Sequence, residues 1–355
     1  MKAWVLHGIN DLRFETVREP EPGEGEALVA VKASAICGSD IPRIYKTGAY
    51  SCPLIPGHEF SGVVIKTGAE VSSGWINKRV GVFPLVPCRE CPPCRKKQYE
   101  MCRHYGYLGS RRNGGFAEYA AVPADNLIEL PEGVSMEAGA MLEPMAVAVH
   151  AMRRIQPRKD ETVAVWGAGT IGLLLVMFLL EAGIGNILVI GNKEYQKRMV
   201  SEAGLPEGNY CDQRTQDTDK WIMERTDGQG AEVIFECVGK NETLVQAVRA
   251  AAPAGRICLV GNPFSDMTLE RDVYWKILRN QLTVTGTWNS SFTHGAGDDW
   301  QYVLERLARR KIAPERLITH KFSLEDLDRG LEIMRDKRED YIKMMAIAGN
   351  RPGLQ

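Results

Sequence analysis

From Met1 to Gly81 the chain consists of short apolar runs separated by glycine and proline. Residues 28–35 alternate between apolar and small or polar side chains, 62–67 are rich in β-branched residues, and 79–83 form another brief run. A period of two is typical of strands, and glycine and proline mark the turns between them. The pattern predicts a small β domain, closed or sandwich-like.

After Pro131 the apolar positions change to helical spacing. Ser135 is a good cap, and residues 136–151 are rich in Ala, Met and Val at that spacing. Glu143 lies inside this segment. A carboxylate on a face of Ala and Met is costly to bury without a partner, and a metal ion would be one.

The pattern then changes to alternating strands and helices. Residues 162–166 read as a buried strand, 167–172 fit G-x-G-x-x-G, and 173–182 read as an apolar helix. In this context the glycines permit a tight turn, and the helix N-terminus faces a pyrophosphate. We therefore predict that a dinucleotide is bound by residues Gly167, Gly169, Thr170, Ile171 and Gly172.

Further strands are expected at 186–190, 233–239, 255–261 and 282–287. Two of them end near Gly239 and Gly261, where backbone could lie against the nicotinamide half of a cofactor, so Cys237, Val260 and Gly261 join the predicted site. The fold class is therefore α/β, with a doubly wound parallel-sheet domain at 148–285 inserted into a β domain formed by 1–147 and 286–355. Charged amphipathic helices are expected at 306–311 and 325–338.

The second strand of the inserted domain lacks the acid that usually bonds the ribose hydroxyls of NAD about 20 residues after the glycines. It ends in Gly191-Asn192-Lys193. Without that acid there is no repulsion against a 2′-phosphate, which Asn192, Lys193 and Arg198 could bind. We favour NADP. NAD stays open, because a glycine and an exposed lysine are compatible with it.

Four of the nine cysteines fall close together: Cys88, Cys91, Cys94 and Cys102. This spacing can wrap one tetrahedral ion, and a closed shell of four thiolates leaves no position for substrate. The segment 86–104 is predicted to be a structural-zinc lobe. A nucleic-acid-binding zinc ribbon is disfavoured, since Arg95-Lys96-Lys97 is a small basic patch.

The charge balance narrows the range of partners. The 44 basic and 45 acidic residues give a net charge of −1 and no bulk attraction to nucleic acid or anionic membrane. The longest apolar run, 173–180, is far short of the roughly 20 residues of a membrane span. The N-terminus enters a strand pattern with no signal-peptide core. We expect a soluble, cytoplasmic protein with small-molecule partners, and no nucleic-acid or membrane partner.

Thiolate, imidazole and carboxylate are zinc ligand types, and a catalytic zinc keeps one position open. Cys37, His58, Glu59 and Glu143 supply such groups. Together with the four-cysteine lobe and the glycine turn, in this order over nearly the whole chain, the motifs Cys37-Gly-Ser-Asp, Gly-His58-Glu and Glu143-Pro resemble the zinc-dependent medium-chain alcohol/polyol dehydrogenases.

The resemblance implies a GroES-like catalytic domain, a Rossmann domain, an active site between them, and assembly as a homodimer or homotetramer. It implies two zinc ions per subunit, with Cys37, His58 and Glu143 holding the catalytic one and Glu59 as an alternating or neighbouring ligand. Ser39 would accept the substrate's proton. Several relatives have a histidine where this chain has Pro42, a difference that concerns only the outer end of the proton relay.

The activity so implied is hydride transfer between NAD(P) and a secondary alcohol of a polyol or polyol phosphate such as galactitol 1-phosphate. A substrate phosphate could be bound by the side chains of Arg43, Lys46, Arg111 and Arg112, and Trp288 with Asn289 would offer a flat, polar wall for a polyol chain. Sorbitol, another unphosphorylated polyol or another secondary alcohol is the alternative substrate. A non-catalytic dinucleotide-binding protein would lack the zinc ligands, and a zinc-free quinone reductase would lack the four-cysteine lobe.

Overall fold

The computed structural model describes residues 1–349, which form two compact units. The first unit contains Met1–Glu143 and residues 291–349, and the second contains Pro144–Ser290. The domain boundaries expected from the sequence, 147/148 and 285/286, lie a few residues from these divisions. Each unit has its own main sheet.

The first unit is built around β3 (Glu26–Ala35), the central strand of a seven-stranded sheet. β3 pairs antiparallel with β4 (Glu59–Thr67) along most of its length. Its other edge is shared by β8 (Tyr119–Pro123) and β17 (Lys343–Ile347). The sheet is completed by β5 (Arg79–Val82), β9 (Leu127–Glu129) and β16 (Ile318–Phe322). The predicted β domain is thereby confirmed.

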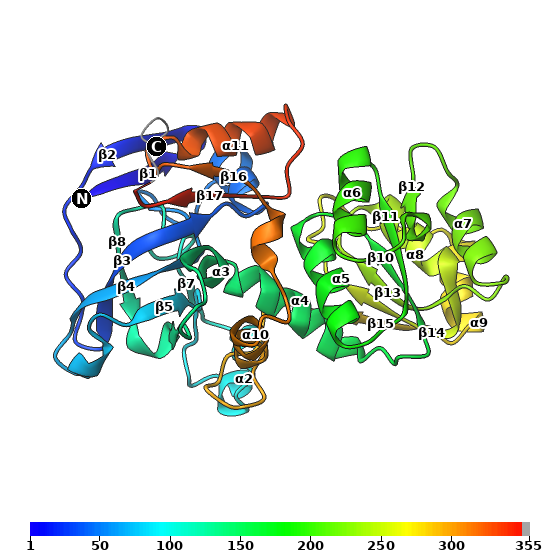
Figure 1. The fold of residues 1–355 in the computed structure, drawn as a ribbon, viewed down its shortest axis with the longest axis horizontal. Coiled ribbons are helices and arrows are strands. Elements are labelled where there is room, and N and C mark those ends of the chain that lie inside the picture. Colours follow the sequence, from blue (N-terminus) through cyan, green and yellow to red (C-terminus); the bar gives the residue numbers. More distant parts are fainter. Residues whose placement is uncertain (350–355) are drawn as a thin grey trace. The chain divides into compact units, whose positions relative to one another are not determined.

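Other elements surround this sheet. They are β1 (Lys2–Gly8), β2 (Asp11–Thr16), β6 (Leu85–Val86), β7 (Gly106–Tyr107), α1 (Asp40–Pro42), α2 (Pro92–Arg95), α3 (Met136–Ala140), α10 (Asp299–Ala308), α11 (Leu327–Asp336), and the 3₁₀ or π turns η1 (Arg43–Thr47), η2 (Ser73–Trp75), η3 (Tyr99–Met101), η4 (Ala124–Asn126) and η6 (Pro314–Leu317). α3 packs on β3, β4 and β5, and α11 packs on β16 and β17 (Figure 1).

The helix expected over 136–151 is interrupted. The Ser135 side chain accepts a hydrogen bond from the Ala138 N–H at 3.0 Å, as expected for a cap. α3 ends at Ala140, and α4 (Leu142–Ile155) begins after Met141. Glu143 therefore lies in the first turn of a second helix, and not in the interior of a continuous one.

The second unit contains a six-stranded parallel sheet. Its order is β12 (Tyr210–Asp212), β11 (Asn186–Gly191), β10 (Thr162–Trp166), β13 (Ala231–Glu236), β14 (Ala251–Leu259) and β15 (Thr283–Gly286). The first strand in sequence lies inside the sheet, and the order reverses there, as in doubly wound nucleotide-binding folds. β10, TVAVW, is buried because helices cover both faces of such a sheet.

Helices α5 (Thr170–Glu181) and α6 (Glu194–Glu202) pack together against β10, β11 and β12, while α7 (Thr218–Arg225), α8 (Asn241–Ala250) and α9 (Arg271–Arg279) form the other layer (Figure 1). α5 is apolar on nearly all sides, which is typical of a buried helix. The short turn η5 (Glu207–Asn209) precedes β12. The α/β fold class is confirmed.

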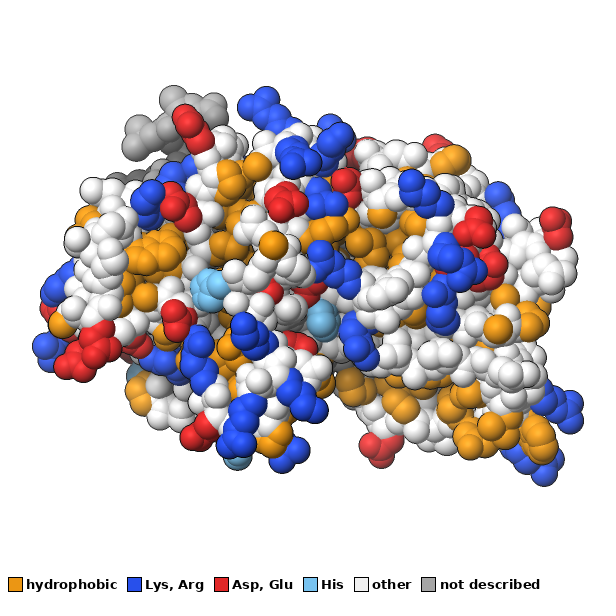
Figure 2. All heavy atoms as spheres, turned by 90° about the horizontal axis from the view of Figure 1, so that it is seen from below, with side chains coloured by type: hydrophobic (Ala, Val, Ile, Leu, Met, Phe, Trp, Pro, Cys, Tyr) orange, Lys and Arg blue, Asp and Glu red, His pale blue; other side chains and the backbone are white. Residues whose placement is uncertain are grey.

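Basic and acidic side chains are both spread over the face drawn in Figure 2, as the near-zero net charge leads one to expect. Within residues 1–349, none of the helices combines the length and apolar character required to cross a bilayer.

Candidate active site

Cys37, His58 and Glu59 converge in the first unit, with their potential ligand atoms within 4.8 Å of one another. Cys37 follows the end of β3, and Glu59 begins β4. The antiparallel register pairs Ala35 with Glu59, so the end of one strand lies beside the start of the next. Strand pairing thus brings together a thiol, an imidazole and a carboxylate that are separated in sequence.

Asp40 is a buried carboxylate beneath this group. It accepts hydrogen bonds from the Cys37 N–H at 2.9 Å and from Arg43 Nη1 at 2.7 Å, and its Oδ1 lies 3.5 Å from His58 Nδ1. Burial opposes ionisation, but His58 and Arg43 outweigh it and lower the pKa of Asp40. Burial likewise opposes charge on His58, yet Asp40 and Cys37 raise its pKa well above the usual value.

Lys343 supplies a buried cation on the other side. It is the first residue of β17, the neighbour of β3, and its ammonium forms an ion pair with Glu59. The same ammonium donates to the Ile36 carbonyl at 3.1 Å. Burial tends to lower the pKa of Lys343, but the negative charge of Glu59 outweighs it, and the pKa is raised.

Glu143 lies outside the tight group of three. It is buried, and its Oε1 accepts a hydrogen bond from the Tyr107 hydroxyl at 3.1 Å. Burial raises the pKa of Glu143 to about 7, with His58, Glu59 and Lys343 acting on its charge. The carboxylate that the structure brings beside Cys37 and His58 is therefore Glu59, while Glu143 as a ligand stays a prediction.

The donor set fits a zinc ion. Sulfur, ring nitrogen and carboxylate oxygen, which are zinc's usual ligands, converge where His58 and Glu59 are buried. Ser39, whose Oγ lies 3.4 Å from Cys37 Sγ, is next to this group.

The four predicted lobe cysteines also converge, with their sulfur atoms within 4.8 Å of one another. Cys88 Sγ lies 4.0 Å from Cys94 Sγ, Cys91 Sγ lies 4.0 Å from Cys102 Sγ, and the Cys88 N–H donates to Cys102 Sγ at 3.2 Å. The Arg103 N–H contributes most to lowering the pKa of Cys91 to about 6. Four sulfur atoms at this spacing fit a closed tetrahedral ion.

In the second unit, the glycine turn joins β10 to α5. Gly167 has a φ of 96°, and a Cβ on Gly172 would lie 1.9 Å from the Gly167 carbonyl oxygen. Thr170 and Ile171 open α5. Neighbouring strand ends carry the other predicted residues: the Cys237 N–H donates to the Trp166 carbonyl, and the N–H groups of Val260 and Gly261 donate to the Glu236 carbonyl.

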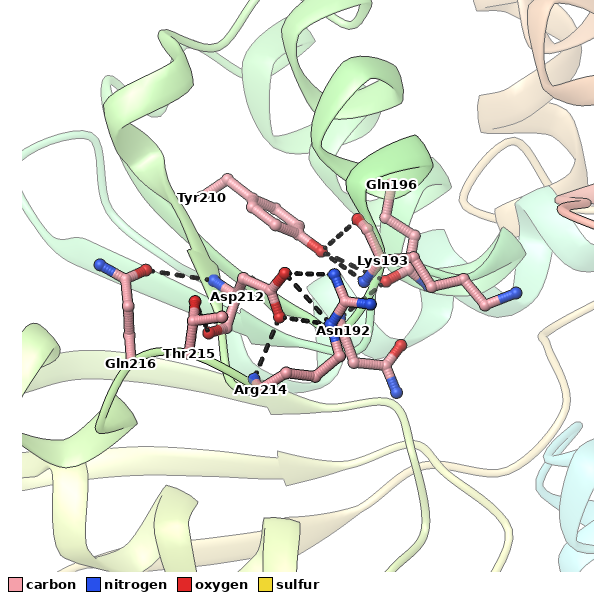
Figure 3. Close-up of polar contacts among 8 residues, drawn as sticks. All are labelled: Asn192, Lys193, Gln196, Tyr210, Asp212, Arg214, Thr215 and Gln216. Atoms are coloured by element: carbon pink, nitrogen blue, oxygen red, sulfur yellow. Dashed lines mark hydrogen bonds and ion pairs between the residues drawn. The ribbon is translucent and has the colours of Figure 1, made fainter.

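Gly191 ends β11, and Asn192 and Lys193 follow it into α6 (Figure 3). Arg198 lies further along α6, where its guanidinium is 5.3 Å from the centroid of the Tyr195 ring. The predicted cofactor residues therefore lie at the carboxyl ends of neighbouring parallel strands or in the helices that follow, as nucleotide sites do in this fold.

The predicted phosphate-binding cations differ in their surroundings. Arg43 is bound to Asp40, and Arg112 forms an ion pair with Glu26. Arg111 lies between two tyrosine rings, 3.8 Å from the centroid of Tyr50 and 4.6 Å from that of Tyr105.

The other three predicted substrate residues are scattered. Lys46 is exposed in η1. Trp288 and Asn289 belong to the second unit, where Trp288 is half exposed and Asn289 Oδ1 accepts from the Ser290 N–H at 2.8 Å.

Sequence reasoning missed Asp40, Lys343 and Tyr107. Asp40 stands within the Cys37 motif, and Lys343 begins a strand, KMMAI, that is otherwise apolar, so both carried a signal. A charged residue in an apolar strand requires a buried partner. Tyr107 carried no comparable signal.

Two family profiles match this chain: the alcohol dehydrogenase GroES-like domain over residues 23–132 and the zinc-binding dehydrogenase over 170–309. Galactitol 1-phosphate 5-dehydrogenase of Escherichia coli K12 is 35% identical over 303 residues, covering 85% of this chain and 87% of the relative. Sorbitol dehydrogenase of Arabidopsis thaliana is 30% identical over 329 residues, covering 91% and 88%.

Solved structures of other dehydrogenases also resemble this chain. Galactitol-1-phosphate dehydrogenase from E. coli has a TM-score of 0.91 at 32% identity, with 98% of this chain and 100% of that one covered. A zinc-binding dehydrogenase of Sinorhizobium meliloti 1021 bound to NADP has a TM-score of 0.89 at 27% identity, with 98% of both chains covered. An E. coli CFT073 short chain alcohol dehydrogenase complexed with NADH also scores 0.89, at 29% identity, covering 98% and 99%. This chain belongs to the zinc-dependent medium-chain alcohol/polyol dehydrogenases.

Proposed function

We propose that this enzyme oxidises a secondary alcohol of a polyol phosphate, with galactitol 1-phosphate as the model substrate, and uses NADP in preference to NAD. The observation that carries the proposal is the convergence of Cys37 with the buried His58 and Glu59 in a chain that also contains a complete dinucleotide turn. Two zinc ions per chain and a cytoplasmic location are parts of the proposal.

Cys37 and His58, with Glu59 or Glu143, would hold the catalytic zinc, which supplies positive charge that lowers the pKa of a substrate hydroxyl. Ser39, adjacent to Cys37 Sγ, would accept the hydroxyl proton and pass its own proton on toward solvent. Lys343 balances the charge of Glu59, and Asp40 orients His58. The glycine turn binds the dinucleotide, whose nicotinamide is the hydride acceptor.

Arg111 is the best-supported contact for a substrate phosphate. Its guanidinium is stacked between Tyr50 and Tyr105, and it forms no ion pair with any residue in 1–349. The Tyr105 ring is 6.2 Å from that of Tyr107, which in turn is 5.7 Å from the ring of His58. Stacking leaves the edges of a guanidinium free for bidentate binding of phosphate. A short series of aromatic rings thus links this cation to the metal group.

The test compares oxidation of galactitol 1-phosphate and galactitol by the wild-type enzyme and by Arg111→Ala. Losing a charge-assisted contact should raise KM for the phosphorylated substrate about 10-fold and leave that for galactitol unchanged. Arg112→Ala is the matched control, because Arg112 is adjacent in sequence but paired with Glu26. Equal losses with both substrates would refute the phosphate contact.

An unphosphorylated polyol is the second candidate substrate. It is favoured by the ion pairs of Arg43 and Arg112, which occupy two of the four predicted cations. In that case galactitol or sorbitol would be oxidised by the wild-type enzyme with a higher kcat/KM than galactitol 1-phosphate.

We further propose a homodimer, alone or within a homotetramer, formed through β15. Among residues 1–349, this strand pairs with β14 alone, and it has the uncharged sequence TVTG. Val284 on β15 is 41% exposed, and the nearby helix α9 exposes Tyr274, Trp275 and Leu278. An unprotected strand edge is a template for pairing, and a second copy related by a two-fold axis presents the same edge.

A further inference from the structure

A side chain at position 191, including the acid that reads ribose hydroxyls, would collide with Tyr210 unless that ring moves. A Cβ added to Gly191 would lie 2.3 Å from Tyr210 Oη and 2.7 Å from Gln196 Oε1. Tyr210 is buried on β12, the strand beside β11. Its hydroxyl donates to the Lys193 carbonyl at 2.8 Å and accepts from the Lys193 N–H at 3.2 Å (Figure 3). An aspartate here would have to displace this anchored ring.

The neighbouring strand β12 does supply an acid, Asp212, but Asp212 is already paired with the guanidinium of Arg214. The register pairs Gly191 with Asp212. Asp212 accepts hydrogen bonds from the Arg214 N–H at 3.0 Å, from Nε at 2.9 Å and from Nη2 at 2.5 Å. Both carboxylate oxygens are therefore engaged by one guanidinium, and the Asp212 side chain is only 16% exposed.

Arg214 keeps donors for a ligand. Its side chain is 55% exposed, and its Nη1 makes no hydrogen bond to any residue in 1–349, while Nε and Nη2 bind Asp212 (Figure 3). Glu194, in the first turn of α6, is a further acid that acts on it. Asp212 fixes the guanidinium before a ligand arrives, which lowers the entropic cost of binding an anion.

We propose that Arg214 is the specificity-determining residue for a 2′-phosphate on the adenosine ribose of the cofactor, with Asp212 as its positioning residue and Tyr210 excluding an acid at position 191. The ligand class is a 2′-phosphorylated adenine dinucleotide. This inference rests on the proposed dinucleotide-dependent function of the same site and names residues outside the Gly191–Lys193 turn.

The test measures binding of adenosine 2′,5′-bisphosphate and of 5′-AMP to the full chain by calorimetry, which requires no hydride transfer. Arg214→Ala should weaken binding of the bisphosphate about 10- to 100-fold, as expected for a lost charge-assisted contact, and leave 5′-AMP unchanged. Arg225→Ala is the matched control, since Arg225 stacks on Trp221 in α7, and it should change the binding of neither ligand. Equal effects of Arg214→Ala on both ligands, or no effect, would overturn the proposal.

Asp212→Asn separates positioning from direct recognition. If Asp212 positions Arg214, the variant weakens binding of the bisphosphate less than Arg214→Ala does and leaves 5′-AMP binding unchanged. If Asp212 instead binds ribose hydroxyls, the variant weakens 5′-AMP, and the assignment of Arg214 is wrong.

The steric role of Tyr210 is tested by a double-mutant cycle with 5′-AMP and the bisphosphate as ligands. Gly191→Asp should weaken both ligands, whereas Gly191→Asp with Tyr210→Ser should recover 5′-AMP binding but not bisphosphate binding. The steric role would be contradicted if the double variant failed to recover 5′-AMP binding, or if Gly191→Asp alone bound 5′-AMP tightly.

Absence of turnover with NAD and with NADP would refute the proposed function, whereas turnover with an unchanged NADP-to-NAD ratio of kcat/KM in Arg214→Ala would refute this inference alone.

Discussion

At the scale of single residues, Lys343 is the buried charge with the clearest consequence for stability. It is 3% exposed, and its ion pair with Glu59 lies beside the metal group. Lys343→Met leaves Glu59 buried without its cation, which should lower the stability of the metal-free protein by about 3–5 kcal/mol in urea unfolding. Lys321→Met is the control, because Lys321 pairs with Glu137 at an exposed position, and should cost under about 1 kcal/mol. Equal losses in the two variants would show that Lys343 acts as an ordinary surface charge.

At the scale of elements, the four-cysteine lobe has little regular secondary structure to hold it, because residues 88–102 contain just α2 and η3. Cys94 is buried among the other three thiols with Tyr99 and Tyr105 packed beside them. Cys94→Ser should lower the zinc content by one ion per chain, measured by elemental analysis, because serine is a poor replacement for a thiolate ligand. Cys52→Ser, which changes an exposed cysteine outside both groups, should leave the zinc content unchanged. An unchanged zinc content in Cys94→Ser would contradict a structural ion here.

At the scale of the whole molecule, the open edge of the parallel sheet should determine assembly. Val284→Lys places a charge on the exposed edge strand, where it would be desolvated in a paired sheet. We expect the variant to be monomeric, or to lose one level of assembly, in light scattering after size exclusion. Ile65→Lys is the matched control, because Ile65 is also 41% exposed but lies on β4, which has partners on both sides. An assembly that survives Val284→Lys would place the interface elsewhere.

The sequence predicted the second unit well because its signals are local. The apolar run of β10, the glycines and the helix after them are adjacent in the chain, and each constrains the backbone on its own. The prediction was wrong for the helix at 306–311. α10 spans Asp299–Ala308, since Trp300, Val303, Leu304 and Leu307 give its buried face, and Arg310 has a φ of 52°. The continuous helix at 136–151 was also wrong, because the chain breaks at Met141.

By itself, the sequence determined the class of chemistry: zinc ligand types at Cys37 and His58, a four-thiol lobe, and a glycine turn, all of which are short motifs. The tertiary structure alone decided which distant groups complete them. Lys343 reaches Glu59 because β17 lies beside β3, and Tyr210 closes position 191 because β12 lies beside β11. The physical reason is that burial and ion pairing depend on neighbours in space, which strand order sets and residue spacing along the chain does not.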